Sequence, residues 1–217
     1  MHLIIAIDGP SGVGKGTVAR AVAAQLGLRH VDTGAMYRAL AWRGLQLGVD
    51  LDDEAAVLAL VKAAVFDVQG SLVVVDGQDA SAAIRTPEID RAVTRVARLP
   101  QVRAEMVARQ RAMADQGGVV MEGRDIGTVV FPDAPVKIYL DASPEERARR
   151  RAHDPAHESS QTQALADIAR AMERRDDADR TRANSPLAIA PDATVIDTTS
   201  MPIAEVVDRV LLAASAR

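Results

Sequence analysis

The sequence of 217 residues contains no cysteine, and aromatic residues make up only 2% of it. The absence of cysteine excludes disulfide bonds, zinc–thiolate sites and thiol catalysis. So few aromatic side chains offer no stacking platform for single-stranded nucleic acid, and the core must consist of aliphatic residues and alanine. The net charge of −4 at pH 7 is also opposite in sign to that of most proteins that bind nucleic-acid polymers. We therefore expect no such partner.

The chain also lacks a long apolar run. Its opening apolar stretch, residues 3–7, is interrupted by Asp8 and has no basic segment before it, which predicts neither a signal peptide nor a membrane span. We expect a cytoplasmic protein without a membrane partner. The length and the 48% share of apolar residues suit one α/β domain, 1–217, with room for a small insert. The acidic balance and the absence of basic tails favour a monomer.

The most informative segment that is present is a glycine-rich loop between the first apolar run and the helix-like stretch 18–26. A backbone that wraps an anion must turn several N–H groups inward, through conformations that glycine adopts at little cost. Lysine brings a positive charge to the β- and γ-phosphates, and the helix that follows adds its positive N-terminal end. We therefore predict a phosphate-binding loop over residues 9–17, which are Gly9-Pro10-Ser11-Gly12-Val13-Gly14-Lys15-Gly16-Thr17.

One position departs from the general pattern of such loops. The pattern has Ser or Thr directly after the lysine, whereas this sequence has Gly16 there and Thr17 next. The alternative interpretation is a glycine-rich turn with a solvated lysine. The apolar run before the loop and the helical stretch after it favour the phosphate-binding interpretation.

Five short β-branched runs alternate with helical stretches: 3–8, 30–32, 119–122, 136–141 and 194–197. This alternation predicts a parallel sheet covered by helices. Each run ends in an acidic residue, which would place carboxylates at the sheet edge where open α/β folds bind ligands. A buried strand followed by a helix-capping aspartate would give the same pattern without any function.

The interval 65–85 breaks the alternation. Residues 65–68 and 72–75, joined through 69–71, predict an antiparallel hairpin, and the helix-like stretch from Thr86 to Arg98 completes a small insert. Ser143 and Pro144 predict one helix start, and residues 200–202 predict the last. The arginine-rich segment 145–182 has i,i+4 pairs, Glu145/Arg149 and Glu146/Arg150, that a solvated helix pair would also show.

Four motifs follow one another along the chain: Ile7-Asp8-Gly9-Pro10-Ser11-Gly12, Asp32-Thr33-Gly34-Ala35-Met36-Tyr37-Arg38, Gly123-Arg124-Asp125-Ile126-Gly127-Thr128, and Arg175-Asp176 with Asp179 and Arg182. In this order they resemble the cytidylate kinase family of nucleoside monophosphate kinases over nearly the whole length. The resemblance implies a five-stranded parallel P-loop core wrapped by helices. It also implies a monophosphate-binding insert at about 63–100 and a short lid at about 150–162. The implied reaction is transfer of the ATP γ-phosphoryl group to CMP or dCMP, with magnesium.

Phosphoryl transfer mainly requires that two anionic groups be aligned and surrounded by positive charge, and the arginine fork suits phosphate oxygens. The ATP contacts that the resemblance implies are Gly9, Ser11, Gly12, Val13, Gly14, Lys15, Gly16 and Thr17. The implied contacts to the acceptor phosphate are Arg38, Arg124 and Arg182. Arg147 and Arg151 would close over the transferring group, and we expect Arg149 and Arg150 to be solvated. The implied catalytic set is Lys15, Arg124, Arg147 and Arg151.

Magnesium should bind mostly to phosphate oxygens and water, with Thr17 touching its shell. A carboxylate at a strand end would assist. Both Glu122 and Asp32 qualify, and the sequence does not decide between them.

Cytosine carries an amine donor where uracil carries an acceptor, so a fixed carboxylate distinguishes the two bases. The resemblance gives this role to Asp125, assisted by Thr94, with Arg103 donating to the cytosine carbonyl and ring nitrogen. A hydrogen bond to a charged group implies roughly a ten- to hundredfold preference for CMP over UMP. Asp179 would contact the sugar, and Thr33 and Tyr37 complete the implied CMP site. The alternative for Asp125 is a helix cap or an ion pair with Arg124.

Related enzymes remain alternatives. Guanylate kinases share Gly-Pro-Ser-Gly and adenylate kinases share Gly-Lys-Gly-Thr, so the acceptor nucleotide is the open point, as is the choice between CMP and dCMP. A regulatory GTPase would read guanine with Asn-Lys-x-Asp. The sole asparagine, Asn184, is followed by Ser185, which argues against a GTPase.

Overall fold

The computed structural model describes residues 2–69, 72–154 and 164–216. Its main sheet has five parallel strands in the order β2-β6-β1-β7-β8. The strands are β1 (Ile4–Asp8), β2 (Arg29–Asp32), β6 (Val119–Gly123), β7 (Val136–Asp141) and β8 (Thr194–Asp197). All five predicted runs are therefore confirmed as strands of one parallel sheet.

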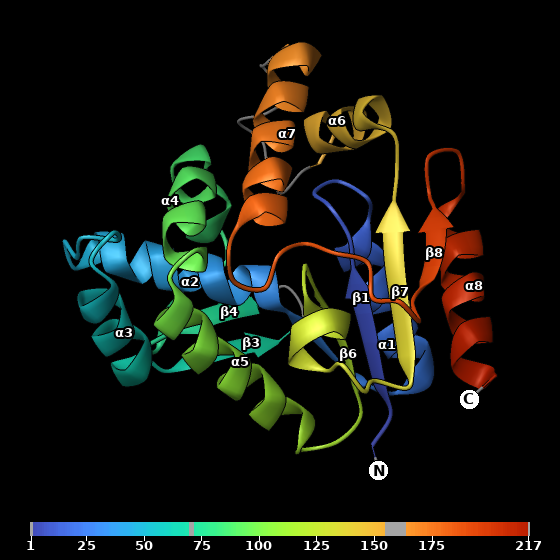
Figure 1. Cartoon of the computed structure of the whole chain (residues 1–217), viewed down its shortest axis with the longest axis horizontal. Coiled ribbons are helices and arrows are strands. Elements are labelled where there is room, and N and C mark those ends of the chain that lie inside the picture. Colours follow the sequence, from blue (N-terminus) through green and yellow to red (C-terminus); the bar gives the residue numbers. More distant parts are fainter. Residues whose placement is uncertain (1, 70–71, 155–163, 217) are drawn as a thin grey trace.

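Helices cover both faces of this sheet (Figure 1). Successive residues of a strand point to opposite faces, so Ile5 and Ile7 pack with α1 (Lys15–Leu26) and α8 (Ile203–Ser215). Ala6 lies on the other face, in the core that includes α2 (Thr33–Gln46) and α5 (Pro100–Ala114). Both layers are built almost entirely from Val, Ile, Leu, Met and Ala, as the scarcity of aromatic residues predicts.

The interval after α3 (Glu54–Ala63) forms a second, antiparallel sheet of β3 (Phe66–Gln69), β4 (Leu72–Val75) and β5 (Gln78–Asp79). The predicted hairpin is confirmed, and β5 is a third strand that the sequence pattern did not indicate. A short turn, η1 (Ala83–Arg85), leads to α4 (Pro87–Ala97). The Thr86 hydroxyl accepts a hydrogen bond from the Ile89 N–H at 3.3 Å and so caps α4. This helix packs on α2, beside the main sheet.

The C-terminal part contains α6 (Pro144–Ala152) and α7 (Leu165–Thr181), which pack on each other. Ser143 caps α6 as predicted, and α8 begins directly after Pro202. Of the two i,i+4 spacings, Glu146/Arg150 forms an ion pair at 2.8 Å. Arg149 also pairs with Glu146, at 2.7 Å, rather than with Glu145, since a helix brings positions i+3 and i+4 to the same side.

Residues 150–152 of the expected lid end α6, and residues 155–162 lie outside the described residues. Within the described ranges, no helix has both the length and the apolar character that crossing a membrane requires.

Candidate active site

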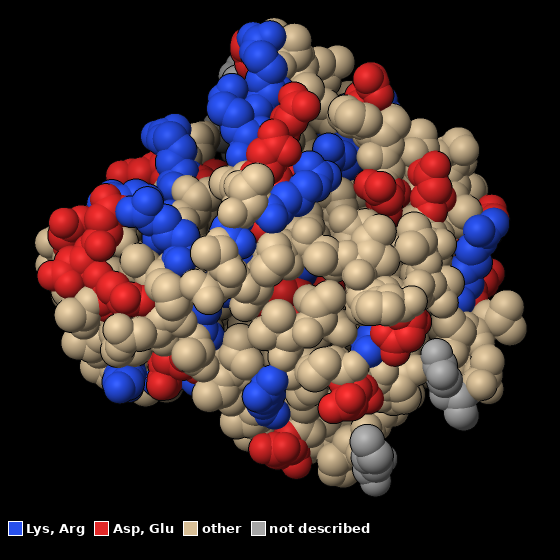
Figure 2. Space-filling view, viewed as in Figure 1, with Lys and Arg blue, Asp and Glu red and all other residues tan. Residues whose placement is uncertain are grey.

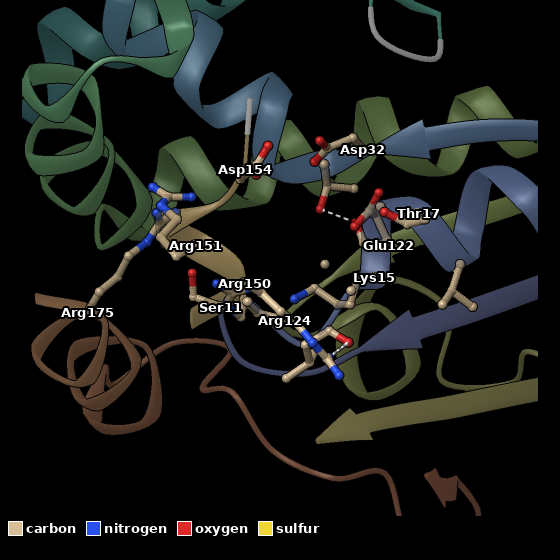
Figure 3. A pocket seen from close by; sticks show the side chains of 18 of the residues that line it. Ser11, Lys15, Thr17, Asp32, Glu122, Arg124, Arg150, Arg151, Asp154 and Arg175 are labelled. Atoms are coloured by element: carbon tan, nitrogen blue, oxygen red, sulfur yellow. Dashed lines mark hydrogen bonds between the residues drawn. The ribbon is translucent and has the colours of Figure 1, made fainter. Parts of the chain in front are cut away.

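A cavity of about 1150 Å³ lies at the carboxyl ends of the main strands, where open α/β sheets bind ligands. Most of the predicted site residues line it: Ser11, Gly12, Val13, Gly14, Lys15, Gly16, Thr17, Asp32, Thr33, Tyr37, Arg38, Arg103, Glu122, Arg124, Asp125, Arg151, Asp179 and Arg182. The fold thus brings together segments that are widely separated in sequence. Figure 3 shows the cavity with Lys15 near its middle and Arg151 at one end.

The glycine-rich loop follows β1 directly and turns through left-handed backbone conformations. Gly9 has a φ of +147°, and a Cβ there would lie 2.1 Å from the Leu140 carbonyl oxygen, so only glycine fits. Gly14, with φ of +92°, is the residue before the first turn of α1. The positive N-terminal end of α1 therefore faces the cavity, as a phosphate-binding loop requires.

Lys15 is the first residue of α1 and is almost fully buried. Its ammonium donates hydrogen bonds to the carbonyl oxygens of Gly9 at 2.8 Å and Pro10 at 2.6 Å. Burial, with a smaller effect of nearby Arg124, lowers the pKa of Lys15 from 10.5 to about 7. An anion in the cavity would favour the charged form of this amine.

Gly16 occupies the position where the general pattern has Ser or Thr. A Cβ at Gly16 would lie 3.3 Å from both Arg20 Nη1 and Glu122 Oε1, so the Glu122 carboxylate restricts this position. Glu122 is buried and its Oε1 lies 2.8 Å from His30 Nε2. Burial and the charge of Asp32 raise the pKa of Glu122. A side chain at Gly16 would therefore require the ends of Arg20 and Glu122 to shift by a few tenths of an ångström.

Oxygen donors gather beside the lysine. Glu122, Asp32 and Thr17 all line the cavity, and Figure 3 shows Thr17 and Glu122 close together. Asp32 also accepts the Ala35 N–H at 2.9 Å and caps α2. Hydroxyl and carboxylate oxygens are the donor types that magnesium prefers, so this chemistry fits the ion. Among the described residues, no three His, Cys, Asp or Glu side chains form a ready-made metal cluster.

Asp179 of α7 connects two of the predicted phosphate-binding arginines. Its carboxylate accepts from Arg124 Nε at 3.0 Å and from Arg182 Nη1 at 3.4 Å. Arg124 also donates to the Gly9 carbonyl oxygen at 3.0 Å and so contacts the glycine-rich loop. These positive charges lower the pKa of Asp179 despite its burial. Both guanidiniums are thereby held at the cavity wall.

Asp125 and Arg103 form a buried ion pair at another part of the cavity wall. Arg182 Nη2 lies 3.7 Å from the other oxygen of Asp125, and the Arg103 guanidinium lies 5.4 Å from the centre of the Tyr37 ring. The alternative pairing of Asp125 with Arg124 is not what the structure shows. Burial raises the pKa of Tyr37 to about 12. The Tyr37 hydroxyl and Arg103 Nε are buried and have no hydrogen-bond partner among the described residues.

Thr94 lies away from this pair. Its hydroxyl donates to the Arg91 carbonyl oxygen of the preceding turn at 2.8 Å, a common bond for threonine within a helix. Its side chain lines a neighbouring cavity of about 450 Å³ rather than the large one. The expected cooperation of Thr94 with Asp125 is therefore not present in this structure.

Two expectations about α6 are also corrected. Arg147, expected to close over the transferring group, instead forms a buried ion pair with Asp176 of α7 and is absent from the described cavity wall. Arg150, expected to be solvated, lines the cavity and donates to Thr198 Oγ1 at 2.9 Å and to the Val13 carbonyl oxygen at 3.3 Å. The side chain of Arg149 is 60% exposed. Arg147 thus contacts α7, whereas Arg150 contacts the glycine-rich loop and Thr198, the residue after β8.

Several residues of the site have functions that the sequence did not indicate. Arg175 and Asp176 stand in the fourth motif, yet their tasks become visible only from their partners. Arg175 lines the cavity and donates to Asp90 at 3.0 Å, whereas Asp176 is fully buried below the loop. No local signal in the sequence singles out Asp90.

A phosphate-binding loop after the first strand of a parallel sheet, facing a cavity lined with arginines, defines a P-loop kinase. The family model described as cytidylate kinase matches residues 5–216. The chain therefore belongs to the cytidylate kinase family.

Individual relatives agree. The chain is 50% identical over 214 residues to a cytidylate kinase of Geobacillus sp. (strain WCH70), covering 97% of this chain and 95% of that protein. It is 48% identical over 213 residues to a cytidylate kinase of Desulfitobacterium hafniense (strain Y51), covering 97% and 91%. A gluconokinase structure from Sinorhizobium meliloti 1021 matches with a TM-score of 0.50 at 15% identity, covering 99% of this chain and 92% of that one. This last likeness concerns the fold alone.

Proposed function

We propose that the protein transfers the γ-phosphoryl group of ATP to CMP or dCMP, which yields ADP and CDP or dCDP. The observation that carries the proposal is that one cavity contains both the glycine-rich loop and the Asp125–Arg103 pair. The loop suits the donor phosphates, and the pair suits a base that has one amine donor beside two acceptors.

In this reaction an oxygen of the acceptor phosphate attacks the γ-phosphorus, and the bond from the γ-phosphorus to the bridging oxygen of ADP breaks. The attacking oxygen is already anionic, so no general base is required. Lys15 would hold the donor phosphates. Arg38, Arg124 and Arg182 would hold the acceptor phosphate, and Arg151 would face the transferring group. Arg147 would act through the loop backbone rather than by touching a substrate.

Magnesium bound with ATP would neutralise charge on the β- and γ-phosphates. Thr17, Glu122 and Asp32 are the residues that would hold it, in part through water. Since Glu122 Oε1 already faces His30 at 2.8 Å and Asp32 caps α2, both carboxylates have protein partners that fix their orientation.

For the base, Asp125 would accept the cytosine amine while Arg103 donates to the carbonyl and ring nitrogen. Asp179 would contact the sugar, and Thr33 and Tyr37 would border the nucleotide. A uracil would present a carbonyl oxygen to Asp125 in place of the amine, so that carboxylate would lose the donor from the base and face another acceptor. This is the proposed source of selectivity for CMP over UMP.

We further propose that residues 63–100 form the monophosphate-binding insert and residues 150–162 a lid. The packing of α4 on α2, next to the cavity, supports the first assignment. The protein is proposed to act as a cytoplasmic monomer with small-molecule substrates and without nucleic-acid or membrane partners. Sedimentation at assay concentrations tests the monomer, and a stable dimer would contradict it.

The deciding experiment offers CMP, dCMP, UMP, AMP and GMP separately with ATP and magnesium, and measures each diphosphate directly. Turnover restricted to CMP and dCMP is the expected result. Faster turnover of AMP or GMP would overturn the assignment of the base site. Tight GTP binding without phosphoryl transfer would instead favour the GTPase alternative.

A further inference from the structure

Asp90, on α4, joins arginines from three other helices. Its carboxylate accepts from Arg38 Nε of α2 at 3.4 Å and from Arg175 Nη1 of α7 at 3.0 Å, and it is also paired with Arg151 of α6. The three arginine side chains are 15–16% exposed and that of Asp90 is 22% exposed. One carboxylate therefore lies at the centre of three largely buried guanidiniums.

The three guanidiniums share one carboxylate, while Asp154 and Asp179 add smaller negative contributions at Arg151 and Arg175, respectively. Burial is the main cause that lowers the pKa of Arg151 and brings that of Arg175 to about 10, and the positive charge of Arg38 adds to both effects. Asp90 acts in the opposite direction on each. Arg38 thus repels both Arg151 and Arg175, and a further negative charge would stabilise the charged form of these guanidiniums.

Two of the three arginines, Arg151 and Arg175, line two neighbouring cavities. Arg38, Arg151 and Arg175 all line the large cavity, whereas Asp90 lines the neighbouring cavity of about 450 Å³ together with Arg151 and Arg175. Figure 3 shows Arg151 and Arg175 at the same end of the large cavity, and Figure 2 shows basic side chains gathered over α4 and α7. A phosphate group in the large cavity would therefore reach the same guanidiniums that Asp90 holds from the other side.

We propose that Asp90 is a positioning residue that assembles Arg38, Arg151 and Arg175 before the nucleotide binds and then competes with the nucleotide phosphate for them. The proposal rests on the proposed function for the identity of the nucleotide, but the required chemistry is only a dianionic phosphate. Phosphate oxygens accept the same forked hydrogen bonds as a carboxylate. Once phosphate is bound, the negative charge of Asp90 opposes it. Asp90 therefore weakens acceptor binding while it keeps the arginines together.

The test is Asp90→Asn, which keeps the side-chain volume and removes the charge. The Kd for CMP of the ATP-free enzyme, measured by calorimetry, is expected to fall by about three- to tenfold. The KM for CMP should fall with it, while the KM for ATP changes less. A merely structural role would instead change the melting temperature without this difference between the two substrates. Unchanged or weaker CMP binding would overturn the proposal.

Inorganic phosphate serves as a probe that does not depend on turnover. The affinity of the protein for inorganic phosphate should rise in Asp90→Asn and in Asp90→Ser. This measurement tests the role of Asp90 even if CMP proves not to be the acceptor. Equal or weaker phosphate binding in both variants counts against it.

Asp52→Asn is the matched control. On the surface, the Asp52 carboxylate accepts hydrogen bonds from Arg95 Nη2 at 2.6 Å and from Arg98 Nη2 at 2.7 Å. Asp52 lines neither of the two cavities. The control should leave phosphate affinity unchanged. A gain equal to that of Asp90→Asn would show a general effect of net charge and would contradict the specific role.

Discussion

Arg147 and Asp176 form a buried ion pair that holds the backbone of Ser11 from both sides. The Arg147 guanidinium donates to the Ser11 carbonyl oxygen at 3.1 Å, and the Ser11 N–H donates to the Asp176 carboxylate at 3.1 Å. Arg147 and Asp176 lie 136 and 165 residues beyond Ser11 in the sequence. The conformation of the glycine-rich loop therefore depends on α6 and α7.

Asp176→Ala is expected to destabilise the protein by about 3–5 kcal/mol, because it leaves Arg147 buried without its counter-ion. Urea unfolding measures this loss, and the KM for ATP should rise in the same variant because the Ser11 N–H loses its acceptor. Asp177→Ala is the matched control, since Asp177 is 61% exposed and pairs only weakly with Arg180 at 3.2 Å. Equal losses in the two variants would contradict the clamp on Ser11.

Lys15→Ala should lower kcat by about 10³-fold, since it removes a fixed positive charge from the phosphates during transfer. Steady-state kinetics with ATP and CMP measure the effect. The far-UV circular dichroism should remain that of the parent, because the replaced ammonium is costly to bury. Lys62→Ala, at an exposed position on α3, is expected to retain full activity. A Lys15 variant with the parent rate would refute the role of the loop.

ATP binding should take up protons above neutral pH. The ligand-free Lys15 amine has a pKa of about 7, so it is largely neutral at pH 8, and the charge of bound phosphates raises that pKa toward the ordinary 10.5. Uptake of up to one proton per ATP is therefore expected between those two values, and ATP affinity should fall as the pH rises. Calorimetry in buffers of different ionisation enthalpy measures the uptake. The same uptake in Lys15→Met would assign it to another group.

Asp125→Asn should reduce the preference for CMP over UMP by roughly ten- to hundredfold. The amide can donate to the uracil carbonyl, whereas its oxygen still accepts from Arg103. The ratio of kcat/KM for the two nucleotides is the measurement, with the KM for ATP as internal control. An unchanged ratio would mean that another residue distinguishes the bases.

The main sheet and the glycine-rich loop follow from local patterns. Most of the strands are short runs rich in β-branched residues, and the loop needs glycine at Gly9 because the Leu140 carbonyl oxygen lies so near. Two apolar runs separated by a turn likewise predict the hairpin of the second sheet. The third strand, β5, has only two residues, too few to show any alternation.

The partners of individual side chains were harder to predict from the sequence. Thr94 was expected at the base, but it bonds to its own helix, because a helical hydroxyl reaches the preceding turn. Arg147 and Arg150 lie on the same helix, and their sequence neighbours do not indicate that Arg147 binds Ser11 and Asp176 whereas Arg150 binds Val13 and lines the cavity. The three arginines around Asp90 come from α2, α6 and α7, so no sequence window contains the cluster.

Residue types at short spacing are enough to predict the strands along the chain, the phosphate-binding loop and the family. Only the folded structure reveals the strand order within the sheet, the clamp of Arg147 and Asp176 on Ser11, and the position of Asp90 among three arginines. The physical reason is that ion pairs act through space. Their partners are set by how helices pack, and packing depends on the whole core rather than on any one segment.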